Sequence, residues 1–334
     1  MENVALKSLD HYWYSRNPVS IGLLPAAWLY RLGVSARRRY YRLTSEFRQR
    51  PEVPVVVVGN ITTGGTGKTP MVIWLVSLLK KNGFKPGVVS RGYGGQSKVW
   101  PQVVTMTSDP VEVGDEPVLI ARRARCPLVV APDRMQAVRQ LLDRFDCDVV
   151  VSDDGLQHYA LQRDIEILMV DGRRRFGNGF CLPAGPLREP LSRLEDYGLI
   201  VANGQAADGE FTMALAYSRL INQQNPGVTL PLGAFVGKQV NAVAGIGNPA
   251  RFYSTLRAKG IDVREHTFAD HHSYTPQDLQ FDDRLPILMT EKDAVKCQRF
   301  GAHHHWYLPI SVRPERALAK TVIATLKRHG QKTA

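Results

Sequence analysis

The residues best suited to chemistry lie in the stretch Val53–Pro70, VPVVVVGNITTGGTGKTP. Its β-branched run predicts a buried strand, and its glycines let backbone N–H groups turn toward an anion. Lysine in such a loop neutralises the β- and γ-phosphates of a nucleotide, and a following threonine hydroxyl coordinates Mg²⁺. Strand, glycine loop, Lys-Thr and apolar helix together predict nucleotide binding rather than an ordinary turn. The predicted binding residues are Thr62, Thr63, Gly64, Gly65, Thr66, Gly67, Lys68 and Thr69.

The spacing of this loop departs from two common patterns. The usual phosphate loop has a glycine where this chain has Thr62, and partitioning-type dimeric ATPases have a lysine where it has Thr63. The loop therefore belongs to a narrower group of nucleotide-binding proteins.

A second apolar run, Val149–Ser152, ends in the acids Asp153 and Asp154. A strand ending in carboxylates is how nucleotide-binding folds hold Mg²⁺ against phosphates, so both are predicted metal ligands. A simple Asp-Asp-Gly turn is the alternative. Gln157 and His158 follow and are expected to face the same crevice.

A carboxylate and a histidine far apart in the chain form a candidate base. Asp115 and Glu116 precede a helix, either as helix-capping acids or as a catalytic carboxylate and a further metal ligand. His271 follows a predicted strand, and histidine is the usual proton acceptor near neutral pH. Held close to Asp115, it would deprotonate a sugar or alcohol hydroxyl; a structural histidine is the alternative.

From Val53 onward, strand and helix patterns alternate, which predicts a largely parallel sheet covered by helices. Ligands bind at the carboxyl ends of such strands, where the residues above lie. We expect three parts: an N-terminal helical segment (1–50), a phosphate-loop core (51–228) and a smaller C-terminal α/β domain (229–334). The tract His303–His305 lacks the spacing of a metal site and is expected at the surface.

The charge of the chain is concentrated at its start. Residues 1–50 hold nine basic and three acidic side chains, a net +6 and half of the total +12. Aromatic and leucine residues beside arginines are typical of a segment lying among lipid headgroups, although a helix pair packed on the protein's own core is the alternative. The uncharged run 17–30 is too short to span a bilayer. The four cysteines lack paired spacing, which argues against zinc sites and disulfides and fits a reducing cytosol.

Seven motifs, taken in order, resemble those of the tetraacyldisaccharide 4′-kinases of lipid A synthesis. They are Thr62–Pro70 (TTGGTGKTP), Ser90–Gly94 (SRGYG), Gly114–Pro117 (GDEP), Asp153–His158 (DDGLQH), Pro183–Pro190 (PAGPLREP), Phe268–His271 (FADH) and Thr290–Asp293 (TEKD). The set covers most of the chain, and Thr62 is ordinary in that family.

The resemblance implies ATP- and Mg²⁺-dependent transfer of the γ-phosphoryl group to the 4′-hydroxyl of an acylated glucosamine disaccharide 1-phosphate. It also implies attachment through residues 1–50 to the cytoplasmic face of the bacterial inner membrane. By motif, Asp115 and His271 resemble the base-forming pair. Lys68 and Asp154 resemble catalytic residues, and Thr69, Asp153, Asp154 and Glu116 metal ligands. The acceptor-contacting residues are expected to be Arg91, Tyr93, Gln157, His158, Arg188 and Glu189.

Three other functions remain open on the residues alone. They are a P-loop ATPase or switch acting on a protein, an ATPase acting on nucleic acid, and a soluble small-molecule kinase. The absent signature lysine disfavours the first, and the concentration of charge in an aromatic leader disfavours the second. We therefore expect no nucleic-acid partner and no obligate protein partner.

Overall fold

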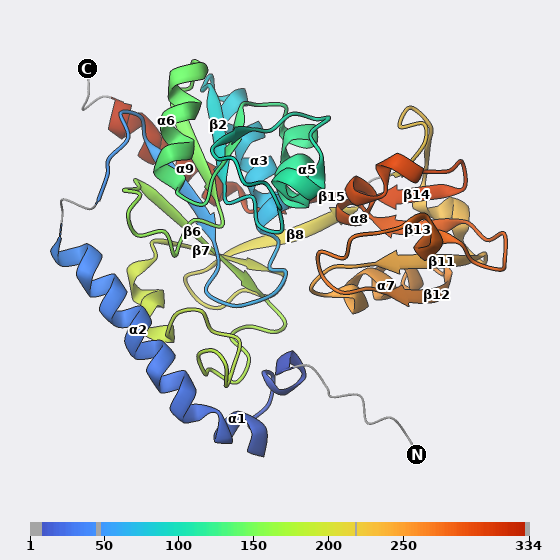
Figure 1. The fold of residues 1–334 in the computed structure, drawn as a ribbon, viewed down its shortest axis with the longest axis horizontal. Coiled ribbons are helices and arrows are strands. Elements are labelled where there is room, and N and C mark those ends of the chain that lie inside the picture. Colours follow the sequence, from blue (N-terminus) through green and yellow to red (C-terminus); the bar gives the residue numbers. More distant parts are fainter. Residues whose placement is uncertain (1–8, 45–47, 218, 331–334) are drawn as a thin grey trace. The chain divides into compact units, whose positions relative to one another are not determined.

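The structure, a computed structural model, describes residues 9–44, 48–217 and 219–330 (Figure 1). The chain divides into two compact units. Unit 1 comprises 1–68, 149–213 and 314–334, and unit 2 comprises 69–148 and 214–313. The three-part division expected above stays a prediction. The helices are α1 (Pro18–Gly22), α2 (Leu24–Leu43), α3 (Lys68–Lys81), α4 (Pro110–Val113), α5 (Asp115–Ala124), α6 (Arg134–Arg144), α7 (Pro249–Arg257), α8 (Glu291–Lys296) and α9 (Arg316–Gly330). The strands are β1 (Val55–Gly59), β2 (Pro86–Ser90), β3 (Gln102–Val103), β4 (Leu128–Val130), β5 (Val149–Asp153), β6 (Ile165–Asp171), β7 (Leu199–Asn203), β8 (Phe211–Tyr217), β9 (Leu220–Asn222), β10 (Thr229–Leu230), β11 (Gln239–Ala244), β12 (Asp262–Thr267), β13 (Ile287–Thr290), β14 (His305–Leu308) and β15 (Ile310–Pro314).

The sheet of unit 1 is parallel, with the strand order β5-β1-β6-β7-β8. All five residues of β1 are buried, as expected for a β-branched strand covered on both faces. Val58 of β1 lies opposite Asp153 of β5. The loop that follows β1 and the acids that end β5 therefore leave the sheet at the same edge.

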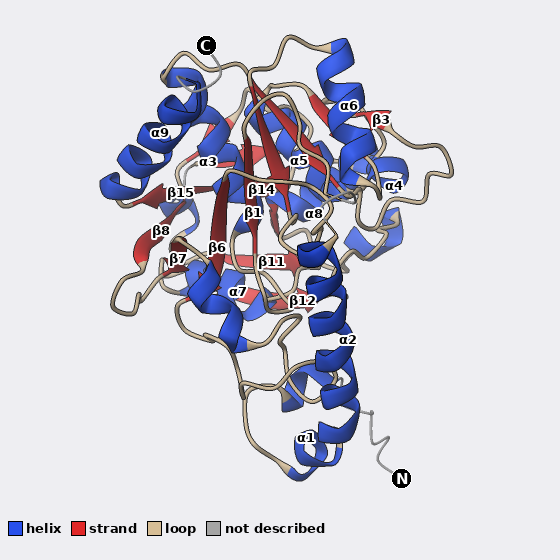
Figure 2. Cartoon of the chain, turned by 90° about the vertical axis from the view of Figure 1, so that its left-hand side faces the viewer, coloured by secondary structure: helices blue, strands red, loops and turns tan. Residues whose placement is uncertain are grey.

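Helix α2 packs against the segment that precedes β7. Asn17 and Ser20 form a reciprocal cap on α1, and α2 follows as one continuous helix (Figure 2). The indole Nε1 of Trp13 donates to Pro183 O at 3.0 Å, and the Tyr30 hydroxyl donates to Arg188 O at 3.1 Å. These contacts fix the N-terminal helices to the loop that carries Arg188.

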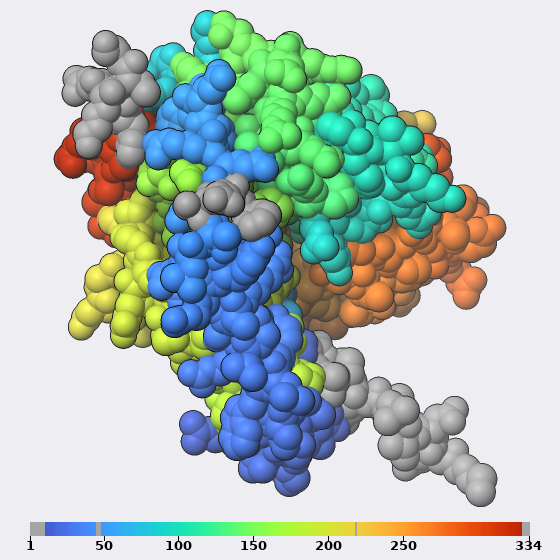
Figure 3. Space-filling model, turned by 60° about the vertical axis from the view of Figure 1, so that its left-hand side comes forward, coloured from blue at the N-terminus to red at the C-terminus, as the bar shows by residue number. Residues whose placement is uncertain are grey.

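The other side of α2 is uncovered (Figure 3). It carries large, exposed apolar side chains. Trp28, Leu29, Leu32 and Leu43 are between 66% and 72% exposed, whereas Ala27 on the packed side is buried. Across residues 9–44, 48–217 and 219–330, no helix has the length and apolar character needed to span a bilayer.

Unit 2 contains a short strand group and a second sheet. Strands β2 and β4 are parallel, and β3 pairs antiparallel with β4. The second sheet has the order β10-β9-β14-β13-β11-β12, with its four-strand portion from β14 to β12 parallel. Helix α7 begins at Pro249 with Asn248 as its cap and packs on β11 and β12. Contacts of α8 with α4 and α5 join the two stretches of this unit.

The predicted fold class is confirmed: the protein is α/β, with mostly parallel sheets and accompanying helices. One expectation was wrong. His305 is buried at the start of β14 rather than at the surface, and burial lowers its pKa to about 4.

The four cysteines are free. Burial raises the pKa of each thiol above its ordinary value, to about 12 for Cys126. Since the thiolate is the reactive form, these cysteines are poor nucleophiles at neutral pH.

Candidate functional site

The loop between β1 and α3 has the backbone of an anion cradle. Gly64 and Gly67 have φ of 98° and 97°, a region open to glycine but strained for other residues. The hydroxyls of Thr63 and Thr66 are buried, and neither has a hydrogen-bond partner among the described residues. Buried donors without partners fit a loop that receives a ligand with many acceptor oxygens, such as a polyphosphate.

Lys68, Asp154 and Arg188 meet beside this loop. Lys68 Nζ lies 3.1 Å from Asn60 Oδ1 and 3.7 Å from Asp154 Oδ1, and Arg188 Nη1 lies 3.1 Å from Asp154 Oδ2. Asp154 has φ 46°, an uncommon conformation for a residue with a side chain. Asp153 is buried at the end of β5. The structure thus brings Lys68 and Arg188 together with Asp154, one of the predicted metal-binding acids.

Gln157 and Glu189 lie behind this group. Gln157 Nε2 donates to Asn60 O at 3.0 Å and to Glu189 Oε1 at 2.8 Å. Glu189 is fully buried, and its other oxygen accepts from Arg193 Nε at 2.6 Å. His158 is half-buried, and its carbonyl accepts from Arg163. The predicted acceptor contacts of these residues stay predictions.

The candidate base lies in unit 2. His271 Nδ1 is 3.2 Å from Asp115 Oδ1, and His271 Nε2 is 3.3 Å from Lys292 Nζ. Lys292 also contacts Glu116 and Asp270, each at 3.1 Å. With Nδ1–H donated to Asp115, the neutral ring leaves the Nε2 lone pair as its proton acceptor.

The charged side chains of this cluster shift one another's pKa values. Burial opposes protonation of His271, but the hydrogen bond with Asp115 and the negative charges of Asp115 and Asp270 together outweigh it and raise the pKa of the imidazole. Burial would raise the pKa of Asp115, but His271 and Lys292 lower it below its usual range. Burial likewise disfavours the ammonium of Lys292, yet Glu116 and Asp115 raise its pKa. Asp115 is therefore ionised and Lys292 charged near neutral pH.

The predicted SRGYG motif reaches the same cluster. The ring of Tyr93 meets the imidazole of His271 edge to face, with centroids 5.0 Å apart. A Cβ at Gly94 would lie 3.4 Å from His271 Nδ1, so glycine gives the ring its room. Arg91 is exposed. The motif therefore packs against the imidazole of His271.

Predicted metal ligands fall in both units. Asp153 and Asp154 belong to unit 1, and Glu116 belongs to unit 2, where it pairs with Lys292. The described residues include no group of three or more His, Cys, Asp or Glu side chains placed to hold a metal ion. Mg²⁺ bound with a nucleotide takes most of its ligands from phosphates and water, so one or two carboxylates have suitable donor chemistry.

Three residues near these groups were not predicted. Asn60 follows β1 without any pattern to mark it, and Arg193 lies in a short turn of helix. Lys292 belongs to a motif whose role was left open, and the helix α8 that presents it was missed because it is only six residues long. The position of Lys292 between two acidic residues was the one signal available in the sequence.

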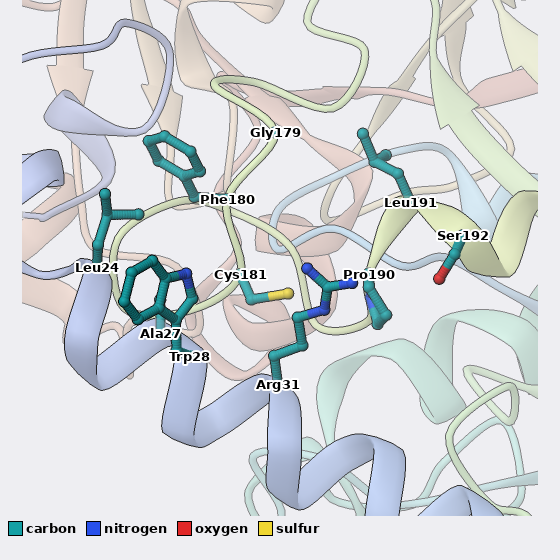
Figure 4. A pocket seen from close by; sticks show the side chains of 10 residues that line it. All are labelled: Leu24, Ala27, Trp28, Arg31, Gly179, Phe180, Cys181, Pro190, Leu191 and Ser192. Carbon is teal, nitrogen blue, oxygen red and sulfur yellow. The ribbon is translucent and has the colours of Figure 1, made fainter.

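A pocket lies between α2 and the 179–192 segment of unit 1 (Figure 4). Its volume is about 240 Å³. Leu24, Ala27 and Phe180 form an apolar wall, and the guanidinium of Arg31 extends toward Pro190.

Comparison with known proteins gives concordant matches. The family model described as tetraacyldisaccharide-1-P 4′-kinase matches residues 19–327. The tetraacyldisaccharide 4′-kinase of Nitrosococcus oceani is 50% identical over 96% of this chain and 95% of its own. That of Methylobacillus flagellatus is 49% identical over 96% of both chains.

A solved structure agrees. The crystal structure of LpxK from Aquifex aeolicus in complex with ATP has a TM-score of 0.78 and 29% identity, covering 92% of this chain and 99% of that one. Together with the phosphate loop and the paired Asp115 and His271, these matches place the chain in the tetraacyldisaccharide-1-P 4′-kinase family.

Proposed function

We propose that this chain transfers the γ-phosphoryl group of ATP to the 4′-hydroxyl of a tetraacylated glucosamine disaccharide 1-phosphate. The observation that carries the proposal is the contact of His271 with Asp115, in a family member that also has a glycine cradle with Lys68. A cradle alone would serve any nucleotide-binding protein. A charged carboxylate holding an imidazole adds a base for an alcohol acceptor.

The loop residues fit ATP and Mg²⁺. Unpartnered hydroxyls at Thr63 and Thr66 and the φ of Gly64 and Gly67 suit phosphate oxygens. Lys68 would neutralise the β- and γ-phosphates, and Asp153, Asp154 and Thr69 would hold the cation, with Glu116 as a further candidate. The cation supplies charge neutralisation to the transferring group, because phosphoryl transfer depends mainly on positioning and electrostatics.

His271 would accept the proton of the attacking hydroxyl at Nε2. Asp115 holds Nδ1–H, fixing the tautomer and stabilising the imidazolium that forms. Lys292 contacts Nε2 in this structure, so the incoming hydroxyl would displace it. Arg91, Tyr93, Gln157, His158, Arg188 and Glu189 are the proposed acceptor-binding residues, with Arg188 suited to an anionic group.

We further propose that α2 docks shallowly on the cytoplasmic face of the bacterial inner membrane. Trp28, Leu29, Leu32 and Leu43 supply apolar contact, and the arginines of residues 1–50 supply attraction to anionic lipids. The pocket with Leu24, Ala27 and Phe180 suits part of an acyl chain, with Arg31 near its polar end. Neither nucleic acid nor an obligate protein partner is part of this proposal.

The test is incubation of the purified chain with γ-labelled ATP, Mg²⁺ and a bacterial membrane lipid extract, followed by separation of the products. The expected result is label on an acylated disaccharide, absent with Lys68→Ala. Release of labelled phosphate without lipid labelling would support a switch ATPase. Equal labelling of a water-soluble sugar would support a small-molecule kinase instead.

A further inference from the structure

A continuous series of polar contacts links α2 to Lys68, entirely within unit 1. At its outer end, Arg38 and Arg42 of α2 both donate to Asp196, with Arg42 Nη2 3.0 Å from Asp196 Oδ1. Arg193 Nη1 donates to Asp196 Oδ2 at 2.5 Å. Asp196 therefore joins the helix to Arg193.

Arg193 is held on all sides. Its Nε donates to Glu189 Oε2 at 2.6 Å, its Nη2 donates to the Tyr197 hydroxyl at 2.9 Å, and its guanidinium lies 4.6 Å from the Tyr197 ring centroid. The side chain of Arg193 is 6% exposed and that of Glu189 is not exposed. Because each nitrogen of the Arg193 guanidinium makes a hydrogen bond, the buried pair of Arg193 and Glu189 is held in a single arrangement.

From Glu189 the series continues to the phosphate loop. Gln157 Nε2 bridges Glu189 Oε1 and Asn60 O, and the buried Asn60 accepts from Lys68 Nζ at 3.1 Å through Oδ1. Asn60 also donates to Thr62 O at 2.7 Å. One residue thus fixes both the lysine and the first turn of the loop, and its own backbone is fixed by Gln157.

We propose that Arg193 is a positioning residue for phosphoryl transfer, holding Glu189 and Asp196 together so that Gln157 and Asn60 keep Lys68 in place. The inference rests on the proposed function, since it concerns the lysine that serves ATP. It requires no contact between Arg193 and either substrate. Misplacement of a reacting or charge-stabilising group by about 1 Å can cost on the order of a hundredfold in rate.

The experiment compares the full chain with four variants. Arg193→Met combined with Glu189→Gln removes both charges, so that no buried charge is left unpaired. Arg193→Lys keeps the charge beside Glu189 but cannot reach all partners of the guanidinium. Asp196→Asn weakens the link to α2. Glu166→Gln is the matched control, because Glu166 also pairs with a largely buried arginine, Arg163, at 3.1 Å in unit 1.

The measurements are kcat and the KM of each substrate at saturating concentrations of the other, the Kd of ATP, and Tm. For the double variant we expect kcat to fall about tenfold or more, with the Kd of ATP within about threefold, because Lys68 stays present but mispositioned. Arg193→Lys and Asp196→Asn should give smaller decreases in kcat. Glu166→Gln should match the wild type.

Three results would overturn the inference. One is a folded double variant whose kcat equals that of Glu166→Gln. Another, which decides the case if the double variant does not fold, is wild-type kcat in both Arg193→Lys and Asp196→Asn. A change confined to the KM of the lipid would leave Glu189 only the acceptor-binding role proposed above and would refute positioning. If the wild-type chain neither binds ATP nor labels lipid, the proposed function itself fails, which is a separate result.

Discussion

His271 adopts φ 61°, in the left-handed region where a residue other than glycine is strained. Such strain persists where the surroundings impose it, and here Asp115, Lys292 and Tyr93 surround the ring. The backbone cost is offset by contacts that orient one imidazole. Such a fixed orientation is expected of an imidazole that must direct one ring nitrogen at a substrate.

Removing either member of this pair should slow chemistry more than it weakens nucleotide binding. We expect Asp115→Asn and His271→Gln each to lower kcat about a hundredfold or more, with the Kd of ATP changed less than about threefold. His272→Gln is the control, because His272 pairs with Asp278 instead. Wild-type turnover in both variants would remove His271 from the role of base.

The pairing of His271 with Asp115 also predicts how the protonation of the His271 ring depends on pH. Because the folded-state pKa of His271 is raised, the neutral, proton-accepting form becomes dominant only above the ordinary value of about 6.5. In Asp115→Asn, burial and Lys292 would both favour the neutral ring and lower its pKa. NMR titration of the His271 ring should therefore give a lower midpoint in the variant.

This raised pKa also affects stability. The contribution of the pair is fully present below the unfolded-state pKa and is lost as pH rises through the folded-state pKa. Asp115→Asn should thus cost more stability at pH 5.5 than at pH 8.5. An unchanged NMR midpoint would contradict the assignment of Asp115 as the main cause.

Among single residues, those that a recognisable pattern marks could be predicted from the sequence. Lys68 and Asp154 were identifiable because a glycine loop and an apolar strand mark them. His271 and Asp115 are 156 positions apart, so only their types, and not their distance, could be foreseen. Asn60 and Arg193 act through burial and hydrogen bonding, which depend on neighbours that the sequence does not reveal.

Among the elements, helix α2 has two faces that differ in polarity and in exposure to solvent. The packed face is polar where it meets Asp196 and the Arg188 carbonyl, while the exposed face is apolar. Exposed apolar surface of this kind marks an interaction site.

Polar substitutions on the exposed face of α2 should weaken membrane binding. We expect Leu29→Ser with Leu32→Ser to lower vesicle affinity about tenfold or more, since each buried leucine contributes about 1.5–3 kcal/mol. Vesicle flotation measures this, with Tm as a check on folding. Val99→Ser is the control, because Val99 is 71% exposed but lies in unit 2. Equal flotation of all three proteins would place attachment elsewhere.

The phosphate loop makes a prediction about Gly67. A Cβ there would lie 3.1 Å from both Asn203 Nδ2 and Met213 Cε, at φ 97°. Gly67→Ala should therefore destabilise the fold by about 1–3 kcal/mol and weaken ATP binding. Gly83→Ala is matched for φ, at 86°, but meets open space. If both variants lose the same stability and bind ATP alike, the close packing of the loop is unimportant.

Elements with apolar sequences were predictable, and elements with mixed sequences were not. The strands Leu128–Val130, Phe211–Tyr217 and Ile287–Thr290 consist largely of apolar residues, a composition that marks a strand in the sequence. Helix α8 and strand β14 carry mixed polar sequences and depend on contacts made by distant parts of the chain.

For the whole molecule, the net charge of +12 predicts salt-sensitive association with anionic lipid. Vesicles containing about 30% anionic lipid should bind the chain more tightly than neutral ones, and raising the salt from 0.05 to about 0.5 M should remove that difference. A residual, salt-insensitive fraction is expected from the apolar face of α2. Binding that is unaffected by both salt and lipid charge would exclude an electrostatic contribution.

The fold class followed from the alternation of strands and helices, but the composition of the two units did not. Unit 2 joins 69–148 with 214–313, so Asp115 and His271 share a unit despite the residues between them. No composition change or linker in the sequence marks this, because the division arises from packing.

Because the native thiols react slowly at neutral pH, a single introduced cysteine could be labelled selectively. With Cys126, Cys147, Cys181 and Cys297 suppressed by burial, Leu32→Cys would present the fastest-reacting sulfur in the protein. An environment-sensitive fluorophore or nitroxide attached there would register immersion depth directly, without replacing any native cysteine.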